Sequence, residues 1–141
     1  MFKIFKPFES VNSKSDVFIT SWNIAAPDEI KSVVKNINRA AKIRGVVGFS
    51  KQSHDCNELK AKVLEYAKMG WSIKVLPSFH AKIWCINSNS WIGSANFCPD
   101  TLQNYMIKCK ITPRLLKFMT QIWQKAYNVN SSSKLWLLPQ K

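Results

Sequence analysis

The sequence predicts an α/β fold in which a mixed β-sheet is flanked by helices. Strand-like apolar runs alternate with segments of helical periodicity, an order typical of sheets with parallel pairing. A turn-rich segment at 87–90 separates two further strand-like runs and indicates a hairpin, which adds antiparallel pairing. The length of 141 residues and the hydrophobic content of 46% are typical of one globular domain.

The first half of the chain predicts two strands and one helix after an irregular lead-in at residues 1–14. A β-rich run predicts the first strand at 17–22. Pro27 stands at a natural first helical position, and the apolar stripe that follows predicts a helix closed by Gly45. A short buried strand is then expected at 46–50.

The second half begins with Asp55 and Glu58, which resemble a capping box at the start of a helix that Gly70 ends. Thr112 and Pro113 are a suitable N-cap and first residue for a last helix through about residue 127. Four more strands are expected, at 72–76, 81–86, 91–93 and 105–111. We therefore expect one domain over residues 15–128 and a tail over residues 129–141.

The charge balance favours a polyanionic partner. The chain has 21 Lys and Arg against 8 Asp and Glu, a net charge of +13, and beyond Asp100 every charged residue is basic. Nucleic acid is the partner that such a field favours, with an anionic membrane surface as the weaker alternative. No run approaches the roughly 18 apolar residues of a membrane span, so no membrane partner is expected. The four cysteines form no CxxC pair, so reduced thiols in a cytoplasmic protein are expected.

Polar side chains suited to a phosphodiester are concentrated between residues 80 and 96. His80 and Lys82 are two apart at the edge of an expected strand, which places both on one face. Ser94 and Asn96 have the same spacing and follow Gly93, so pairing of the two strands would bring the four groups together. An imidazole can act as nucleophile or general acid, and the other groups can hold phosphate oxygens. Taken alone, the pair also fits a solvated face.

No metal or cofactor is expected at this cluster. No group of carboxylates that would bind Mg²⁺ occurs nearby in the sequence. A zinc site at His54 and Cys56 would fit no known ligand spacing. His54 precedes a predicted helix and is expected to be a surface or capping residue.

The spacing of the cluster resembles the HKD motif of the phospholipase D superfamily, HxKxxxxDxxxxxGSxN. The matching residues are His80, Lys82, Gly93, Ser94 and Asn96, and Phe97 continues the usual GSxNF. Segments 22–30 and 44–47 resemble the corresponding parts of small bacterial HKD endonucleases, and the resemblance covers about residues 15–128.

Two positions depart from the family pattern. Asn87 stands where the family has aspartate, which keeps the shape and an acceptor oxygen but loses the charge. Met106 stands where the family often has a glutamate that orients the histidine, so His80 needs another partner. Glu9 and Asp100 are two carboxylates from elsewhere that could replace it.

The resemblance implies a phospholipase D-like half-site that a homodimer completes. One His80 would attack phosphorus and form a phosphohistidine, while the His80 of the second copy protonates the leaving oxygen. Lys82 and Asn96 would clamp the phosphate, supported by Ser94, with Asn87 and Gly93 in supporting positions. The predicted function is a metal-independent phosphodiesterase acting on nucleic acid, an endonuclease with DNA favoured over RNA. The alternatives are a catalytically weak or inactive nucleic-acid-binding protein and a phospholipid phosphodiesterase.

Four further basic residues are candidate contacts to the nucleic-acid backbone: Lys42, Arg44, Lys108 and Lys110. The first two are expected where the first helix ends, and the last two on one face of a strand. Trp84 and Trp91 are expected in the core rather than as platforms for base stacking. The apolar segment 135–138 is expected to pack back on its own domain or across the dimer, the alternative being a docking peptide for a partner protein.

Overall fold

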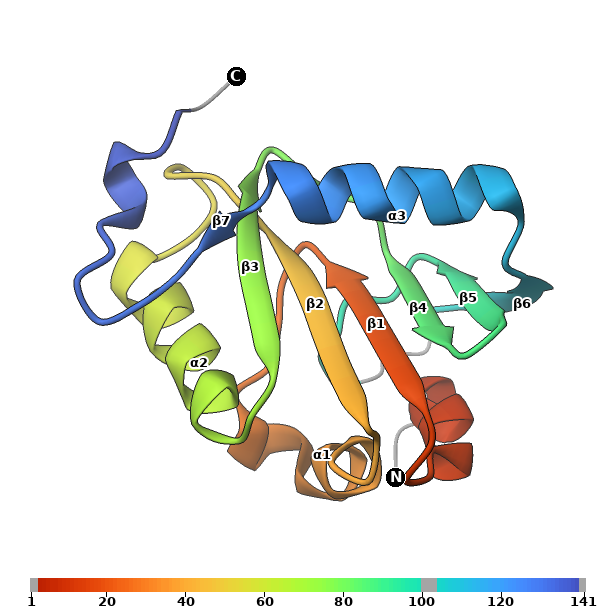
Figure 1. The fold of residues 1–141 in the computed structure, drawn as a ribbon. Coiled ribbons are helices and arrows are strands. Elements are labelled where there is room, and N and C mark those ends of the chain that lie inside the picture. The colour runs from red at the N-terminus through yellow and green to blue at the C-terminus, as the bar shows by residue number, and fades with distance from the viewer. Residues whose placement is uncertain (1–2, 100–103, 140–141) are drawn as a thin grey trace.

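The computed structural model describes residues 3–99 and 104–139, which form a seven-stranded sheet with helices on both faces (Figure 1). The strands are β1 (Asp16–Ser21), β2 (Lys42–Phe49), β3 (Ser72–Pro77), β4 (Ile83–Ile86), β5 (Asn89–Gly93), β6 (Met106–Lys110) and β7 (Tyr127–Asn128). The α-helices are α1 (Lys31–Ile37), α2 (Cys56–Lys68) and α3 (Pro113–Lys125). Three short 3-10 helices are η1 (Lys3–Ser10), η2 (Pro27–Ile30) and η3 (Leu135–Leu137).

The sheet is mixed, as predicted, and its strand order is β6-β5-β4-β1-β2-β3-β7. Strands β1, β2 and β3 are parallel neighbours, whereas β4 is antiparallel to β1 and β5 is antiparallel to β4. Strand β6 is antiparallel to β5, and β7 is antiparallel to β3. The carboxyl ends of β1, β2, β3 and β5 therefore share one edge of the sheet with the amino end of β4.

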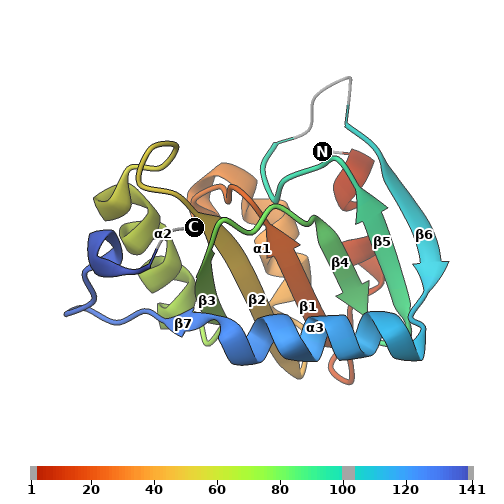
Figure 2. The same cartoon turned by 90° about the horizontal axis from the view of Figure 1, so that it is seen from above.

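Helices α1 and α2 and the N-terminal η1 cover one face of the sheet, and α3 crosses the other face (Figures 1 and 2). The larger core lies under α1, α2 and η1 and includes Trp84, Phe97 and Tyr66. A smaller core lies under α3, where Met119 and Ile122 pack on Phe18 and neighbouring strand residues. None of the described helices is both long enough and apolar enough to span a membrane.

The predicted N-caps of two helices are confirmed, although the Glu58 side chain pairs with Lys62 and does not complete the expected capping box. The Asp55 carboxylate accepts the Glu58 N–H at 3.0 Å at the start of α2. The Thr112 hydroxyl accepts the Leu115 N–H at 3.1 Å at the start of α3. Each side chain satisfies a backbone N–H that lacks a partner within its helix. Gly70, with φ of 91°, follows the end of α2.

The predicted end of the first helix is wrong. The helical region closes at Ile37, and β2 already begins at Lys42, so Gly45 lies inside a strand. A Cβ at Gly45 would lie 2.8 Å from Ile73 Cδ1 and 3.0 Å from Ile19 O, atoms of the two neighbouring strands. This glycine therefore permits close packing within the sheet and does not end a helix.

The ends of the chain contribute to the core. The segment expected to be irregular contains η1, whose Phe5 and Phe8 are buried, each with its ring centroid 5.3 Å from that of Trp84. In η3, Leu135 is buried in the same core, whereas Trp136 and Leu137 are largely exposed. The expectation that the tail packs back on its own domain is confirmed at Leu135.

Candidate active site

The two halves of the HKD-like motif meet at the sheet edge that the carboxyl ends of β1–β3 share. His80 and Lys82 lie in the connection that leaves β3 and enters β4 at this edge, and not on a strand as predicted. Residues 94–96 follow the end of β5 at the same edge. Gly93 N–H donates to Lys82 O at 3.3 Å, which fastens the two segments to each other. In sheets of this kind, ligands bind beyond the carboxyl ends of the strands.

The His80 imidazole is held by a ring stack. Its ring lies 3.9 Å from the Trp22 ring, centroid to centroid, with an interplanar angle of 17°. Neither ring nitrogen of this exposed side chain hydrogen bonds to another of the described residues. Because stacking occupies the face of the imidazole, both edge nitrogens remain available to a substrate.

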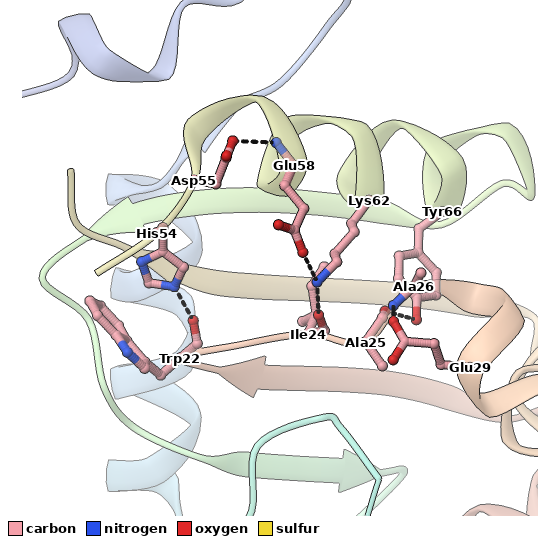
Figure 3. A network of polar contacts seen from close by, with 10 residues as sticks. All are labelled: Trp22, Ile24, Ala25, Ala26, Glu29, His54, Asp55, Glu58, Lys62 and Tyr66. Atoms are coloured by element: carbon pink, nitrogen blue, oxygen red, sulfur yellow. Dashed lines mark hydrogen bonds and ion pairs between the residues drawn. The ribbon is translucent and has the colours of Figure 1, made fainter. Parts of the chain in front are cut away.

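Trp22 is in turn held by His54, a residue that sequence reasoning assigned to the surface (Figure 3). The half-buried His54 lies between β2 and α2 and its ring packs edge-on to Trp22 at 4.4 Å. Its Nδ1 accepts the Ser50 N–H at 3.1 Å, and its Nε2 lies 2.9 Å from Trp22 O. These partners define a neutral tautomer in which Nε2 carries the proton and donates it to the carbonyl.

Helix α2 holds the rest of the loop that follows β1 (Figure 3). Lys62 Nζ donates to Ile24 O at 3.2 Å and pairs with Glu58 at 3.0 Å, and the Tyr66 hydroxyl donates to Ala25 O at 2.8 Å. Burial raises the pKa of the Tyr66 hydroxyl, so it remains a donor at neutral pH. The loop that carries Trp22 is therefore fixed from one side by helix side chains.

Asn96 fixes the same loop from the other side. Its Oδ1 accepts the N–H groups of Trp22 and Asn23, both at 3.1 Å, and lies 3.2 Å from the Ser21 hydroxyl. The amide oxygen of Asn96 is thus fully used in hydrogen bonds to the loop that follows β1. Its amide nitrogen makes no hydrogen bond to another described residue and is the group left to donate to a phosphate.

Lys82 and Ser94 are both engaged within the site. Lys82 Nζ donates to His80 O at 3.0 Å, which places the ammonium beside the histidine backbone. The Ser94 hydroxyl accepts the Tyr105 N–H at 3.0 Å, and the Ser94 N–H donates to Tyr105 O at 3.0 Å. A Cβ at Gly93 would overlap the Tyr105 carbonyl, so the glycine allows the chain before β6 to approach this closely.

Asn87 lies at the opposite end of β4 from this edge. It occupies a two-residue turn with Ser88, since Ile86 already pairs with Asn89, so the turn is shorter than predicted. Asn87 has φ of 55°, a left-handed conformation that Asn tolerates, and its Oδ1 accepts the Asp16 N–H at 2.9 Å. An acceptor oxygen is all that this contact requires, and a neutral amide supplies it.

No carboxylate that orients His80 is found among the described residues. Met106 is half-buried at the start of β6, opposite Gly93, and packs against the larger core. Glu9 lies on η1, where its backbone carbonyl accepts Arg39 at 2.9 Å, and Asp100 lies outside the described residues. Residues 3–99 and 104–139 contain no group of three His, Cys, Asp or Glu side chains placed to hold a metal ion.

The four basic residues expected to contact a nucleic-acid backbone lie in two separate parts of the sheet. Lys42 and Arg44 are on the amino-terminal half of β2 and not at a helix end, so they lie toward the opposite edge of the sheet from His80. There the Arg44 guanidinium packs over Phe18 and Trp123 and lies 3.6 Å from the Asp16 carboxylate.

Lys108 and Lys110 project from one face of the edge strand β6, and both are exposed. Lys108 lies 5.7 Å from the ring of the half-buried Trp91. Trp84 is fully buried, as predicted, and Trp91 packs against the same core. Burial raises the pKa of the Cys98 thiol to about 11, so this neighbour of the motif is not a thiolate nucleophile at neutral pH.

The fold matches solved structures of known proteins. A crystal structure of Nuc from Salmonella typhimurium, a phospholipase D family member, matches with a TM-score of 0.65 and 17% sequence identity over 92% of this chain and 90% of that one. TrmBL2, an archaeal chromatin protein that binds DNA, matches with a TM-score of 0.58 and 19% identity over 90% of this chain. The chain spans about half of TrmBL2, 49% of its length.

At these identities the likeness establishes the fold alone, and it confirms the predicted phospholipase D-like architecture. No protein-family model matches the sequence. No curated protein matches it either.

Proposed function

We propose that the protein is a metal-independent phosphodiesterase that cleaves nucleic acid, with His80 as the nucleophile. One observation carries the proposal. On a phospholipase D fold, His80, Lys82 and Asn96 gather at one sheet edge, and both edge nitrogens of the histidine are open to a substrate. The net charge of +13 favours a polyanionic substrate. The likeness to TrmBL2, which binds DNA, supports DNA over RNA.

The proposed reaction has two steps and uses two copies of the chain. A neutral His80 nitrogen attacks phosphorus and forms a P–N bond as the P–O bond to the leaving group breaks. A protonated His80 of the second copy gives its proton to the leaving oxygen. That second imidazole, now neutral, takes a proton from water, and the resulting hydroxide attacks phosphorus and breaks the P–N bond. Lys82 and the Asn96 amide nitrogen neutralise charge on the phosphate oxygens.

The test is cleavage of supercoiled plasmid and of single-stranded DNA in excess EDTA. We expect cleavage that His80→Ala abolishes and that Lys82→Gln lowers by orders of magnitude. Lys117→Gln is the matched control, because Lys117 is exposed on α3 and its replacement removes the same charge. Sedimentation of the wild-type protein should show a dimer, and a rapidly quenched reaction should yield a phosphate adduct on His80 by mass spectrometry.

A binding protein without efficient cleavage is the second candidate, and it is supported by the lack of an orienting carboxylate for His80 within residues 3–99 and 104–139. Salt-dependent binding of DNA with no cleavage in either EDTA or Mg²⁺ would replace the first proposal by this one. Hydrolysis of phosphatidylcholine vesicles with no action on DNA would instead indicate the phospholipid phosphodiesterase.

A further inference from the structure

An open groove beside His80 is lined by aromatic side chains. It lies between α3, the end of β3, β7 and Pro139 near the C-terminus, and its volume is about 490 Å³. This volume lies within the roughly 300–1,000 Å³ of small-ligand sites. The aromatic residues that line it are Phe79, Phe118 and Tyr127. Phe118 is 41% exposed and Tyr127 is 39% exposed, so the groove presents ring surface to solvent.

The groove and the candidate active site meet at one turn of the chain, where Phe79 lines the groove and His80 follows it directly. Ser78 has φ of 60°, in the left-handed region that non-glycine residues rarely adopt, and its N–H donates to Phe49 O at 2.9 Å. Beyond this turn Phe79 lines the groove, and the next residue, His80, stacks on Trp22. A nucleic-acid strand bound in the groove would therefore pass close to His80.

Gly48 holds the other side of this turn in place. A Cβ at Gly48 would overlap the Phe79 carbonyl oxygen and the Trp22 ring, so the glycine lets the turn pack against the stack. The turn at Ser78 and Phe79, which lines the groove, is thus packed against β2 and the Trp22 ring.

The charge of the groove is complementary to a nucleic-acid backbone. Lys125 lines it, and none of its lining residues is Asp or Glu. Phe118, Ile122 and Lys125 recur at helical spacing along α3, so one face of the helix presents an aromatic ring and, about 10 Å further on, an ammonium. Every charged residue in the described segment 104–139 is basic.

We propose that this groove binds an unpaired stretch of nucleic acid, with bases stacked on Phe118 and Tyr127 and the backbone near Lys125, on its way to His80. This inference rests on the proposed function only in taking nucleic acid as the ligand. Aromatic rings bind the faces of unpaired bases and Lys neutralises phosphates, whereas in a duplex the base faces are covered by their neighbours. The groove therefore specifies single-stranded nucleic acid as the substrate class.

The test is fluorescence anisotropy of the full chain carrying His80→Ala, so that the probe is not cleaved. Three labelled probes of about 12 nucleotides are compared, a length that one small single-strand-binding fold can cover. They are a single strand, an abasic strand with the same backbone charge, and a duplex. We expect the single strand to bind at least fivefold more tightly than the abasic strand, and more tightly than the duplex.

The double change Phe118→Leu with Tyr127→Leu should remove the preference for bases while leaving abasic binding within twofold. Trp136→Leu is the matched control, because this ring is 45% exposed and lies outside the groove. Circular dichroism checks that each variant is folded. Should the double variant not fold, Lys125→Gln is compared with Lys117→Gln, and only the first should weaken single-strand binding.

Equal binding of the normal and abasic strands, or tighter binding of the duplex, would overturn the inference. A double variant that alters the dimerisation constant but not the preference for bases would also overturn it, by making the groove an interface between copies. These outcomes are separate from the nuclease proposal. Base-dependent binding without cleavage would support the groove as a single-strand site and refute the nuclease proposal. His80-dependent cleavage with base-independent binding would support the nuclease proposal and refute the groove as a single-strand site.

Discussion

Replacing His54 with alanine should destabilise the protein and disorder the candidate site. The change removes an acceptor from the Ser50 N–H and a donor from the Trp22 carbonyl, and it deletes the ring packed at 4.4 Å from Trp22. A buried polar group left without a partner costs about 1–3 kcal/mol, and an aromatic contact contributes about 0.5–1.5 kcal/mol. Because His54 is half-buried, water can reach the orphaned groups, and we expect a loss of about 2 kcal/mol in the free energy of unfolding.

The assay is urea denaturation followed by tryptophan fluorescence, with cleavage or probe binding measured in parallel. His54→Asn is the control, because its amide oxygen can accept the Ser50 N–H, and it should recover part of the loss. The expected drop in turnover is about tenfold with little change in probe affinity, because Trp22 supports the ring of His80. A free energy of unfolding within about 0.5 kcal/mol of the wild type would refute the role assigned to His54.

Three further predictions concern the reactivity of His80 and the roles of Cys85 and Asn87. Diethyl pyrocarbonate should modify His80 rapidly and His54 slowly, because both ring nitrogens of His54 are engaged; equal rates would contradict this. Burial raises the pKa of the Cys85 thiol to about 12, so the unfolded chain loses this proton first. Above about pH 9 Cys85 should therefore lower the free energy of unfolding by up to about 1.4 kcal/mol per pH unit, in addition to what the raised pKa values of Cys98 and Tyr66 contribute, and pH-dependent denaturation should be flatter in Cys85→Ala. Asn87→Ala should cost about 1–2 kcal/mol by losing the bond to Asp16 and straining the turn, whereas Asn87→Asp should leave DNA cleavage within twofold.

Local signals were sufficient for much of the fold. The caps at Asp55 and Thr112 act through residues three positions away, so the sequence contains everything needed to predict them. The motif spacing likewise places His80 and Asn96 at one sheet edge, because the strands between them form a tight hairpin.

The failures have a common cause, which is contact between residues distant in sequence. From the sequence alone Gly45 is predicted to end a helix, and only its contacts with β1 and β3 show that it lies within the sheet. Phe5 is buried because it packs on Trp84, and no residue near position 5 in the sequence predicts this contact. His54 joins the site only because β1 and β2 end side by side, which brings it to Trp22. A His and a Trp placed just after adjacent parallel strands are the signal that could have indicated this pair.

The two departures from the HKD pattern have different consequences. Asn87 lies at the opposite end of β4 from the candidate site, and its contact with Asp16 needs only an acceptor oxygen, so in the proposed nuclease an amide should serve there as well as a carboxylate. In the family that the motif resembles, the position of Met106 often holds a glutamate. In the proposed nuclease such a carboxylate would both orient His80 and select its tautomer, and its loss can cost orders of magnitude in rate. The Trp22 stack replaces only the first of these functions, because a ring face restricts tilt but does not bind a proton. In the proposed dimer the tautomer of His80 would then be selected by the group that contacts its ring nitrogens, either a substrate phosphate or the second copy of the chain. Activity should therefore depend on dimer assembly more steeply than it would in a site with its own orienting carboxylate.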